Sequence, residues 1–158
     1  METKNYRQNV GIVVFNQNKQ VLMCSRVGCK DSRWQFPQGG QDAGEDVLTA
    51  AKRELREETG ITSVRFIAQS KEPTRYDFPP EVLKNVRKAG HPHDGQEQRW
   101  VLFEFLGKDS EIDFLTHPEE IEFDSYEWTD IEEAPKRIVY FKKEVYNKVV
   151  AEFKPYIK

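Results

Sequence analysis

Two short apolar runs near the start of the chain predict a pair of buried strands. Val10–Phe15 is mostly β-branched and apolar, and Val21–Ser25 forms a second run after a polar Asn-Gln-Asn segment. Continuous apolar runs of this length, bounded by turn-forming residues, are typical of strands that are buried on both faces. Because the two runs lie so close together in the sequence, we expect them to form a hairpin.

The apolar spacing then changes to that of a helix. The segment Glu45–Thr59 has apolar residues at intervals of three and four, namely Leu48, Ala51 and Leu55. This period predicts an amphipathic helix, and Gly60 directly after it supplies a natural C-terminal stop. A stripe of apolar residues four apart predicts a second amphipathic helix over Phe141–Phe153.

Further strands are predicted along the rest of the chain. They are expected over Trp34–Phe36, Val64–Gln69, Arg99–Leu106 and Phe123–Trp128. The polar stretch Pro79–Gln96, which is rich in Pro and Gly, is expected to be a surface loop with one helical turn. Strands outnumber helices and their spacing is irregular, so we expect an α+β fold in which helices sandwich a mixed sheet.

Composition limits the class of protein. The 158 residues are enough for one domain, which we expect to span 1–158, and 37% hydrophobic residues indicate a globular chain. No apolar stretch approaches the length of a membrane span, and the first seven residues lack the apolar region expected of a secretory signal. The chain has only two cysteines, Cys24 and Cys29, which is too few for a disulfide framework. We therefore expect reduced thiols in a cytoplasmic protein.

The charge of the chain is small in sum but unevenly distributed. The 24 Lys and Arg residues against 27 Asp and Glu residues give a net charge of −3, which argues against broad coating of nucleic acid or anionic membrane. Residues 109–133 hold eleven acidic side chains and no Lys or Arg, whereas residues 136–158 hold seven basic and two acidic ones. This uneven distribution remains compatible with a protein that binds only the phosphorylated end of a nucleic-acid strand.

Three carboxylates in the first predicted helix suggest a metal site. Glu54, Glu57 and Glu58 stand at i, i+3 and i+4, so a helix brings them toward one face. Like charges at this spacing repel, and a divalent cation removes the repulsion. Hard oxygen ligands without convergent Cys or His favour Mg²⁺ or Mn²⁺ over zinc. A solvated acidic helix face is the commoner fate of such glutamates, and spacing alone favours that interpretation.

The residues around these three glutamates favour a metal site over a solvated helix face. Gly39 is followed after five residues by Glu45, and after seven more by Arg53-Glu54-Leu55, one residue, Glu57-Glu58, one residue and Gly60-Ile61. This string matches the Nudix box at every defined position, so the chain resembles Nudix hydrolases. The resemblance implies an α/β/α sandwich, with Glu54, Glu57, Glu58 and the Gly39 carbonyl as ligands of two or more Mg²⁺ ions, for which Mn²⁺ can substitute. It also implies that Arg53 pairs with a box glutamate and orients it.

Segments outside the box resemble the bacterial RNA pyrophosphohydrolases. They are Tyr6–Val13, Trp34–Gly40, Gly95–Trp100, Glu122–Trp128 and Phe141–Tyr146. The resemblance implies that Arg7 and Lys142 contact phosphates, a role that suits cations beside a transferring phosphoryl group, although both could be ordinary surface charges. It also implies that Glu122 reaches the metals from outside the box, with Glu119 and Glu120 as rivals.

The same resemblance assigns Arg26, Val139 and Phe141 to a base near the RNA 5′ end. An arginine plane and an aromatic ring suit stacking on an unpaired base. Phe141 also belongs to the apolar helix stripe, so packing in the core is an equal alternative for it. Tyr76 is expected to be structural.

The function that the resemblance implies is removal of pyrophosphate, or of two successive phosphates, from the 5′ triphosphate end of RNA. Attack by a metal-activated water would leave a 5′ monophosphate, with Glu57 or Glu122 as the residue that takes the proton. Hydrolysis of dinucleoside polyphosphates or free nucleoside triphosphates is the alternative within the same chemistry. A Nudix-fold binding module without catalysis is disfavoured because every box glutamate is present.

Overall fold

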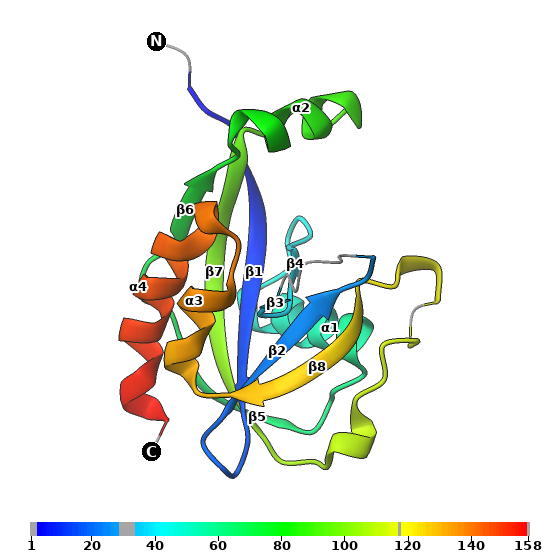
Figure 1. Ribbon diagram of the computed structural model, residues 1–158, viewed down its shortest axis with the longest axis vertical. Coiled ribbons are helices and arrows are strands. Elements are labelled where there is room, and N and C mark those ends of the chain that lie inside the picture. The colour runs from blue at the N-terminus through cyan, green and yellow to red at the C-terminus, as the bar shows by residue number, and fades with distance from the viewer. Residues whose placement is uncertain (1–2, 29–33, 117, 158) are drawn as a thin grey trace.

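The computed structural model describes residues 3–28, 34–116 and 118–157. Two long strands, β1 (Tyr6–Phe15) and β7 (Gly95–Phe105), run parallel at the centre and pair along the whole of β1 (Figure 1). The other strand pairs in the described ranges are antiparallel, so the sheet is mixed, as predicted. Its order is β3 (Trp34–Gln35), β2 (Val21–Arg26), β1, β7 and β5 (Val64–Gln69), and β4 (Gln38–Gly40) pairs with β1, β6 (Thr74–Asp77) with β7 and β8 (Phe123–Thr129) with β2.

The predicted strands are found, with small shifts at their ends. The expected hairpin of the first two strands is largely wrong, because β1 and β2 pair only where Phe15 lies opposite Val21. Beyond that pair β1 continues against β7 and β4, and β2 continues against β8 and β3.

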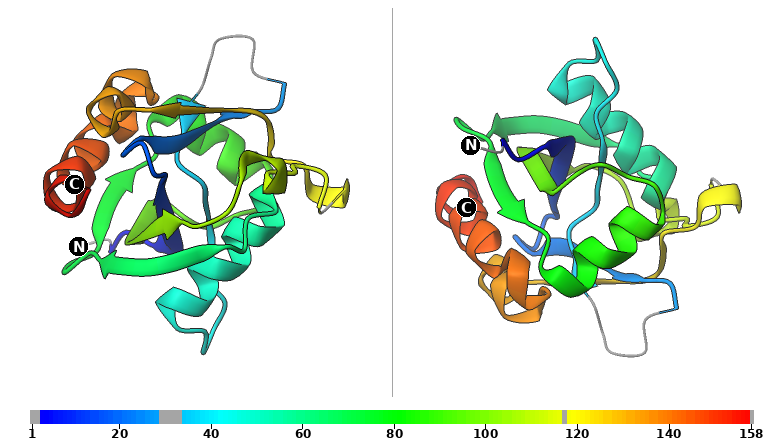
Figure 2. Two further views of the ribbon diagram at one scale, coloured as in Figure 1. Left: turned by 90° about the horizontal axis from the view of Figure 1, so that it is seen from below. Right: turned by 90° about the horizontal axis from the view of Figure 1, so that it is seen from above.

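The central strands are buried on both faces, which explains why their sequences are apolar without alternation. Val13 and Phe15 of β1 belong to one core cluster, and Ile12 and Val14 belong to the other. Helix α1 (Val47–Thr59) packs on the second cluster, while α3 (Ala134–Arg137) and α4 (Lys143–Phe153) pack on the first. Figure 2 shows α1 and α4 on opposite sides of the strands, so the predicted sandwich is confirmed.

Helix α1, which carries most of the box, begins and ends at well-defined caps. The side chain of Asp46 accepts a hydrogen bond from the Thr49 backbone N–H at 2.7 Å. Gly60 ends the helix with φ of +78°, a left-handed conformation that glycine adopts without strain. Buried Ala51 and Leu55 anchor the helix to the sheet and thereby set the direction in which its glutamates point.

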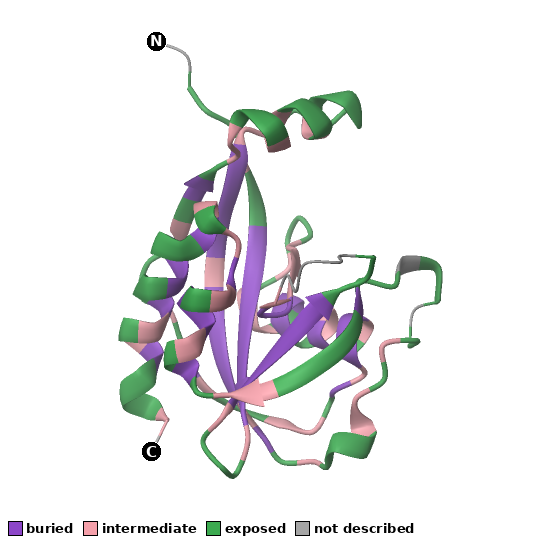
Figure 3. Ribbon diagram, viewed as in Figure 1, coloured by how far each residue is buried: buried purple, intermediate pink, exposed green. Residues whose placement is uncertain are grey.

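The polar stretch after residue 79 is more regular than predicted. In place of a loop with one turn it forms the nine-residue helix α2 (Pro80–Lys88), and β7 begins already at Gly95. Strand β6, which the apolar pattern did not indicate, precedes it. None of the α2 residues is buried, and the helix lies at one end of the molecule (Figure 3). This exposure explains why hydrophobic periodicity failed to predict it.

Short 3₁₀ turns complete the structure. They are η1 (Asp109–Glu111), η2 (Pro118–Glu120), η3 (Ile131–Glu133), η4 (Tyr140–Lys142) and η5 (Lys154–Tyr156). The predicted helix over Phe141–Phe153 is thus divided into η4 and α4, and its stripe residues Val145, Val149 and Phe153 are buried. Within the described ranges, no helix is both long and apolar enough to span a bilayer. Cys24 is a buried free thiol, whereas Cys29 lies outside the described residues.

Candidate active site

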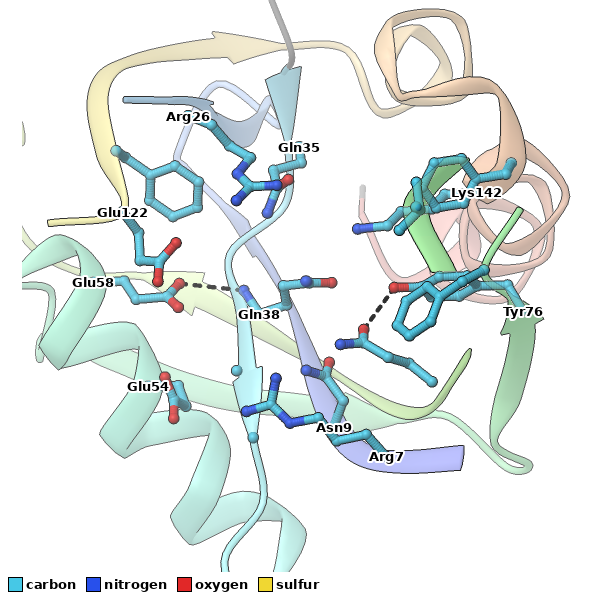
Figure 4. Close-up of a pocket in the computed structure, with 17 residues that line it drawn as sticks. Arg7, Asn9, Arg26, Gln35, Gln38, Glu54, Glu58, Tyr76, Glu122 and Lys142 are labelled. Atoms are coloured by element: carbon cyan, nitrogen blue, oxygen red, sulfur yellow. Dashed lines mark hydrogen bonds between the residues drawn. The ribbon is translucent and has the colours of Figure 1, made fainter. Parts of the chain in front are cut away.

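A pocket of about 360 Å³ lies where α1, β4 and the ends of several strands meet η4 (Figure 4). Most of the residues predicted to act in the site line it. They are Arg7, Arg26, Gly39, Glu54, Glu58, Glu122, Phe141 and Lys142. Segments far apart in the sequence therefore meet in one cavity, with Lys142 on the side opposite the carboxylates and Arg7 near Glu54.

Three carboxylates share one side of this pocket. Glu58 is only 9% exposed, and its carboxylate accepts a 3.3 Å hydrogen bond from the backbone N–H of Gln38. Burial raises the pKa of Glu58 well above its usual range, and the nearby charges of Glu54 and Glu122 raise it further. Burial also raises the pKa of Glu54. The pocket therefore concentrates negative charge that a bound cation would stabilise.

Glu122 reaches the pocket from outside the box because of a backbone contact. Its carbonyl accepts a 2.9 Å hydrogen bond from the N–H of Val27, just beyond β2, and Figure 4 shows its carboxylate beside that of Glu58. Glu119 is exposed and is not among the lining residues. The side chain of Glu120 lies outside the described part of the structure. Among the three acidic candidates, the geometry favours Glu122.

Arg53 binds several box groups at once. Its guanidinium donates to Glu54 at 2.8 Å, to Glu57 at 3.2 Å and to the Gly40 carbonyl at 2.9 Å. It also forms a two-pronged pair with Glu45, at 2.8 and 2.9 Å, which lowers the pKa of that carboxyl to about 2. Arg53 therefore pairs with Glu54 and Glu57 of the box. Glu57 is held by this arginine and is not among the residues that line the pocket.

Two adjacent glycines allow side chains from other elements to approach the β4 backbone. A Cβ on Gly39 would lie 2.1 Å from the carboxyl carbon of Glu54. A Cβ on Gly40 would lie 2.6 Å from a terminal nitrogen of Arg7. Gly39 and Gly40 thus allow a proposed metal-binding carboxylate and a proposed phosphate-binding cation to lie against the same strand.

A buried lysine lies on the side of the pocket opposite the carboxylates. Lys142 is 8% exposed and points into the pocket from the side opposite Glu122, with its Nζ 5.4 Å from the centre of the Tyr76 ring (Figure 4). Burial lowers the pKa of Lys142 to about 8, and the like charge of Arg26 contributes to this shift. Arg7 and Arg26 are more exposed. An anionic substrate would compensate the ammonium group for the solvation that it loses on burial.

The structure separates the residues that were assigned to a base. Arg26 and Phe141 line the pocket, so Phe141 is shared between the pocket wall and the edge of the core. Val139 is not among the lining residues, because it precedes η4 and packs against the core cluster on the α4 side. Tyr76, expected to be structural, does line the pocket and also contacts Phe141, with ring centres 5.8 Å apart.

A set of carboxamides that the sequence did not single out forms the rest of the pocket wall. The lining amides are Asn9, Gln35, Gln38 and Gln96. Behind them, the buried side chain of Gln98 donates to Asn9 at 3.0 Å and to Gln38 at 2.8 Å, while Tyr76 donates to Gln96 at 2.7 Å. The sequence does contain one indication of these groups, because the polar run Gln96–Gln98 precedes the apolar part of strand β7.

The donor set suits a hard divalent cation. Within the described ranges, no group of three Asp, Glu, His or Cys side chains is already arranged to hold a metal ion. Glu54, Glu58 and Glu122 nevertheless line one pocket together with Gly39, and burial, followed by repulsion from the other two carboxylates, raises the pKa of Glu58. Carboxylate and carbonyl oxygens are the ligands that Mg²⁺ and Mn²⁺ prefer.

Comparisons with known proteins decide the family. A model of the NUDIX domain matches residues 5–149. The chain belongs to the Nudix family. Nudix hydrolases generally use divalent metal ions. The chain is 45% identical over 154 residues to the RNA pyrophosphohydrolase of Caulobacter vibrioides, an alignment that covers 97% of this chain and 88% of the relative. It is 44% identical to Nudix hydrolase 27, chloroplastic, of Arabidopsis thaliana, with 96% and 67% covered.

Solved structures show the same Nudix fold at much lower identity. The Escherichia coli dihydroneopterin triphosphate pyrophosphohydrolase matches with a TM-score of 0.69 and 20% identity, over 94% of this chain and 99% of that chain. A Caenorhabditis elegans Ap4A hydrolase complex matches with a TM-score of 0.65 and 18% identity, over 94% and 98%. The predicted family and α+β architecture are therefore confirmed.

Proposed function

We propose that this Nudix hydrolase removes pyrophosphate, or two phosphates in succession, from the 5′ triphosphate end of RNA and leaves a 5′ monophosphate. The observation that carries the proposal is the arrangement of the pocket, in which Glu54, Glu58 and Glu122 face the buried cation Lys142. Its relatives named RNA pyrophosphohydrolase cover nearly the whole chain and support RNA as the substrate. We expect the protein to act in the cytoplasm.

The phosphate chain would lie between the carboxylates on one side of the pocket and Lys142 on the other. Lys142 and Arg7 supply positive charge to the phosphate oxygens, and the buried position of Lys142 strengthens its interaction with an anion. Arg26 and Phe141 offer a guanidinium plane and a ring to a base near the 5′ end. Glu54 and Glu58, with Glu122 and the Gly39 carbonyl, would hold two or more Mg²⁺ ions, for which Mn²⁺ can substitute.

Bound Mg²⁺ supplies charge for the phosphate oxygens and lowers the pKa of a coordinated water. Glu122 accepts the proton of the attacking water, because its carboxylate faces the pocket. Glu57 is the rival for this role and belongs to the proposed ligand set by its place in the box. Reaching the pocket would require its carboxylate to exchange the contact with Arg53. Arg53 positions Glu54 without contacting the substrate.

The proposal is tested by giving the protein Mg²⁺ and three substrates side by side. Triphosphorylated RNA, diadenosine tetraphosphate and free GTP are compared by kcat/KM. We expect the highest value for triphosphorylated RNA. A clear preference for diadenosine tetraphosphate or GTP would favour the alternative substrates, and the absence of hydrolysis of all three would favour a binding module.

A further inference from the structure

The short turn η4 presents three successive side chains at three depths. Tyr140 is 66% exposed, Phe141 is half-buried at the pocket wall, and Lys142 is 8% exposed inside the pocket. A 3₁₀ turn has three residues per turn, so neighbouring side chains point in directions about 120° apart. The turn thus leads from the proposed phosphate contact outward to the surface.

Aromatic rings continue along the same wall. The ring of Tyr140 lies 5.5 Å from that of Phe141, with an interplanar angle of 83°. Phe141 in turn contacts Tyr76 at 5.8 Å, and Tyr76 contacts Phe78 at 5.9 Å. Phe78, Tyr76 and Phe141 line the pocket, so Tyr140 is the outermost member of a row of rings that begins inside it.

Tyr140 is held in place although it is exposed. Its hydroxyl donates a hydrogen bond to the carboxylate of Glu81 in α2. The next residue of that helix, Val82, lines the pocket, so this hydrogen bond lies at the pocket rim. A ring fixed at both its edge and its hydroxyl loses little conformational freedom when a ligand stacks on it.

We propose that the exposed face of Tyr140 binds a second nucleobase, the one that follows the base held at Phe141. This inference rests on the proposed function and names a contact that RNA can make and a free nucleoside triphosphate cannot. The order of side chains along η4 matches the order of groups in such a substrate, with phosphates at Lys142, one base at Phe141 and the next at Tyr140.

The charges near Tyr140 are compatible with a strand that leaves the pocket here. The carboxylate of Glu81 is engaged by the tyrosine hydroxyl. Lys84 and Lys88 stand at exposed positions of the same helix. Lysines beside the path of the strand attract its phosphates without regard to sequence.

The experiment compares Tyr140→Ser and Tyr140→Phe with wild type on free GTP and on triphosphorylated RNAs of two to eight nucleotides. Stacking of one base on an aromatic ring predicts that Y140S raises KM for RNAs of several nucleotides by about five- to 100-fold. Its kcat/KM for GTP is expected to stay unchanged. Y140F keeps the ring and is expected to retain most of the RNA affinity. Tyr156→Ser is the matched control, since Tyr156 is 50% exposed in another 3₁₀ turn, outside the pocket lining.

Equal loss for GTP and RNA, or no change for either, would overturn the assignment of Tyr140. Binding is also measured by fluorescence anisotropy with labelled triphosphorylated RNA, because this readout does not require turnover. Failure of wild type to hydrolyse RNA would contradict the proposed function and leave the binding test intact. Wild-type protein that binds long triphosphorylated RNA no more tightly than Y140S does would contradict the second base site itself.

Discussion

The carboxyl group of Glu54 occupies the space that a side chain on Gly39 would need. An ideal Cβ on Gly39 would lie 2.1 Å from the carboxyl carbon and from one carboxylate oxygen of Glu54. Helix α1 can therefore bring a proposed metal ligand directly against the β4 backbone, whose Gly39 carbonyl is a second proposed ligand. The first residue of the box thus matters for the position of a glutamate fifteen residues later.

Alanine at Gly39 should mainly impair catalysis, whereas alanine at Gly40 should mainly impair substrate binding. Gly39→Ala pushes the end of the Glu54 side chain away, and a displacement of roughly 1 Å can cost about 100-fold in rate. We expect a large fall in kcat with little change in Tm, because the clash is with the end of a flexible side chain. Gly40→Ala displaces Arg7 instead and should mainly raise KM. Steady-state kinetics of both variants would contradict this account if their effects on kcat and KM were the same.

The charge of Lys142 should give the reaction an alkaline limit. Because burial lowers the pKa of Lys142 to about 8, the free protein loses this cation as the pH rises through that value. We expect kcat/KM for triphosphorylated RNA to fall above pH 8 in wild type. Lys142→Arg keeps its charge, so its profile should lack this fall, and Lys142→Met should lose about 10- to 100-fold at pH 7. Identical pH profiles for wild type and K142R would count against the assignment.

Arg53 should act through geometry as well as charge. Lys at this position keeps the positive charge but cannot reach Glu45, Glu54 and Glu57 together. Arg53→Lys is expected to lower kcat by about 10- to 100-fold and to raise the Mg²⁺ concentration needed for half-maximal activity. Arg56→Lys, on the same helix, is the control and should change neither value. Normal Mg²⁺ dependence in R53K would contradict the orienting role.

Glu58 is expected to lower the stability of the metal-free protein at pH 7 although it is needed for hydrolysis. Its raised pKa means that the folded chain binds this proton more tightly than the unfolded chain does, so the stabilisation is complete at acidic pH and lost as pH rises through the folded-state pKa. Without metal, Glu58→Gln should therefore raise Tm at pH 7 by a few degrees while abolishing hydrolysis, and Mg²⁺ should stabilise wild type more than E58Q. Glu144→Gln, at an exposed position, should leave Tm unchanged. Thermal melts with EDTA and with Mg²⁺ check this, and a Tm for E58Q below that of wild type in EDTA would contradict it.

The elements that were predictable from sequence are those whose local signals agree with their packing. Helix α1 has an apolar stripe and the stop Gly60, and both signals agree with the observed helix, whose N-terminal cap Asp46 the structure adds. Strand β1 was recognisable by its apolar run, but its parallel partner β7 begins eighty residues after β1 ends, and no local pattern indicates that pairing. The hairpin prediction for this reason holds only at the Phe15–Val21 pair beside the turn.

The site was predictable where the box defines it and less so where the sheet assembles it. Glu54 and Glu58 lie in the pocket as the helical spacing suggests, whereas Glu57 is held by Arg53. Tyr76 reaches the pocket only because β6 pairs with β7, and β6 is too short and polar to be recognised from its pattern. The carboxamides escaped notice because Asn and Gln carry no spacing rule comparable to that of ligating carboxylates.

The most direct test of the central claim is a single-turnover assay of the RNA 5′ end with Mg²⁺. Wild-type protein in excess is mixed with triphosphorylated RNA, and the 5′ end and the released phosphates are resolved over time. We predict conversion to 5′-monophosphate RNA by wild type and none by E58Q. Triphosphate ends that stay intact, under conditions in which the same preparation hydrolyses diadenosine tetraphosphate, would contradict the account.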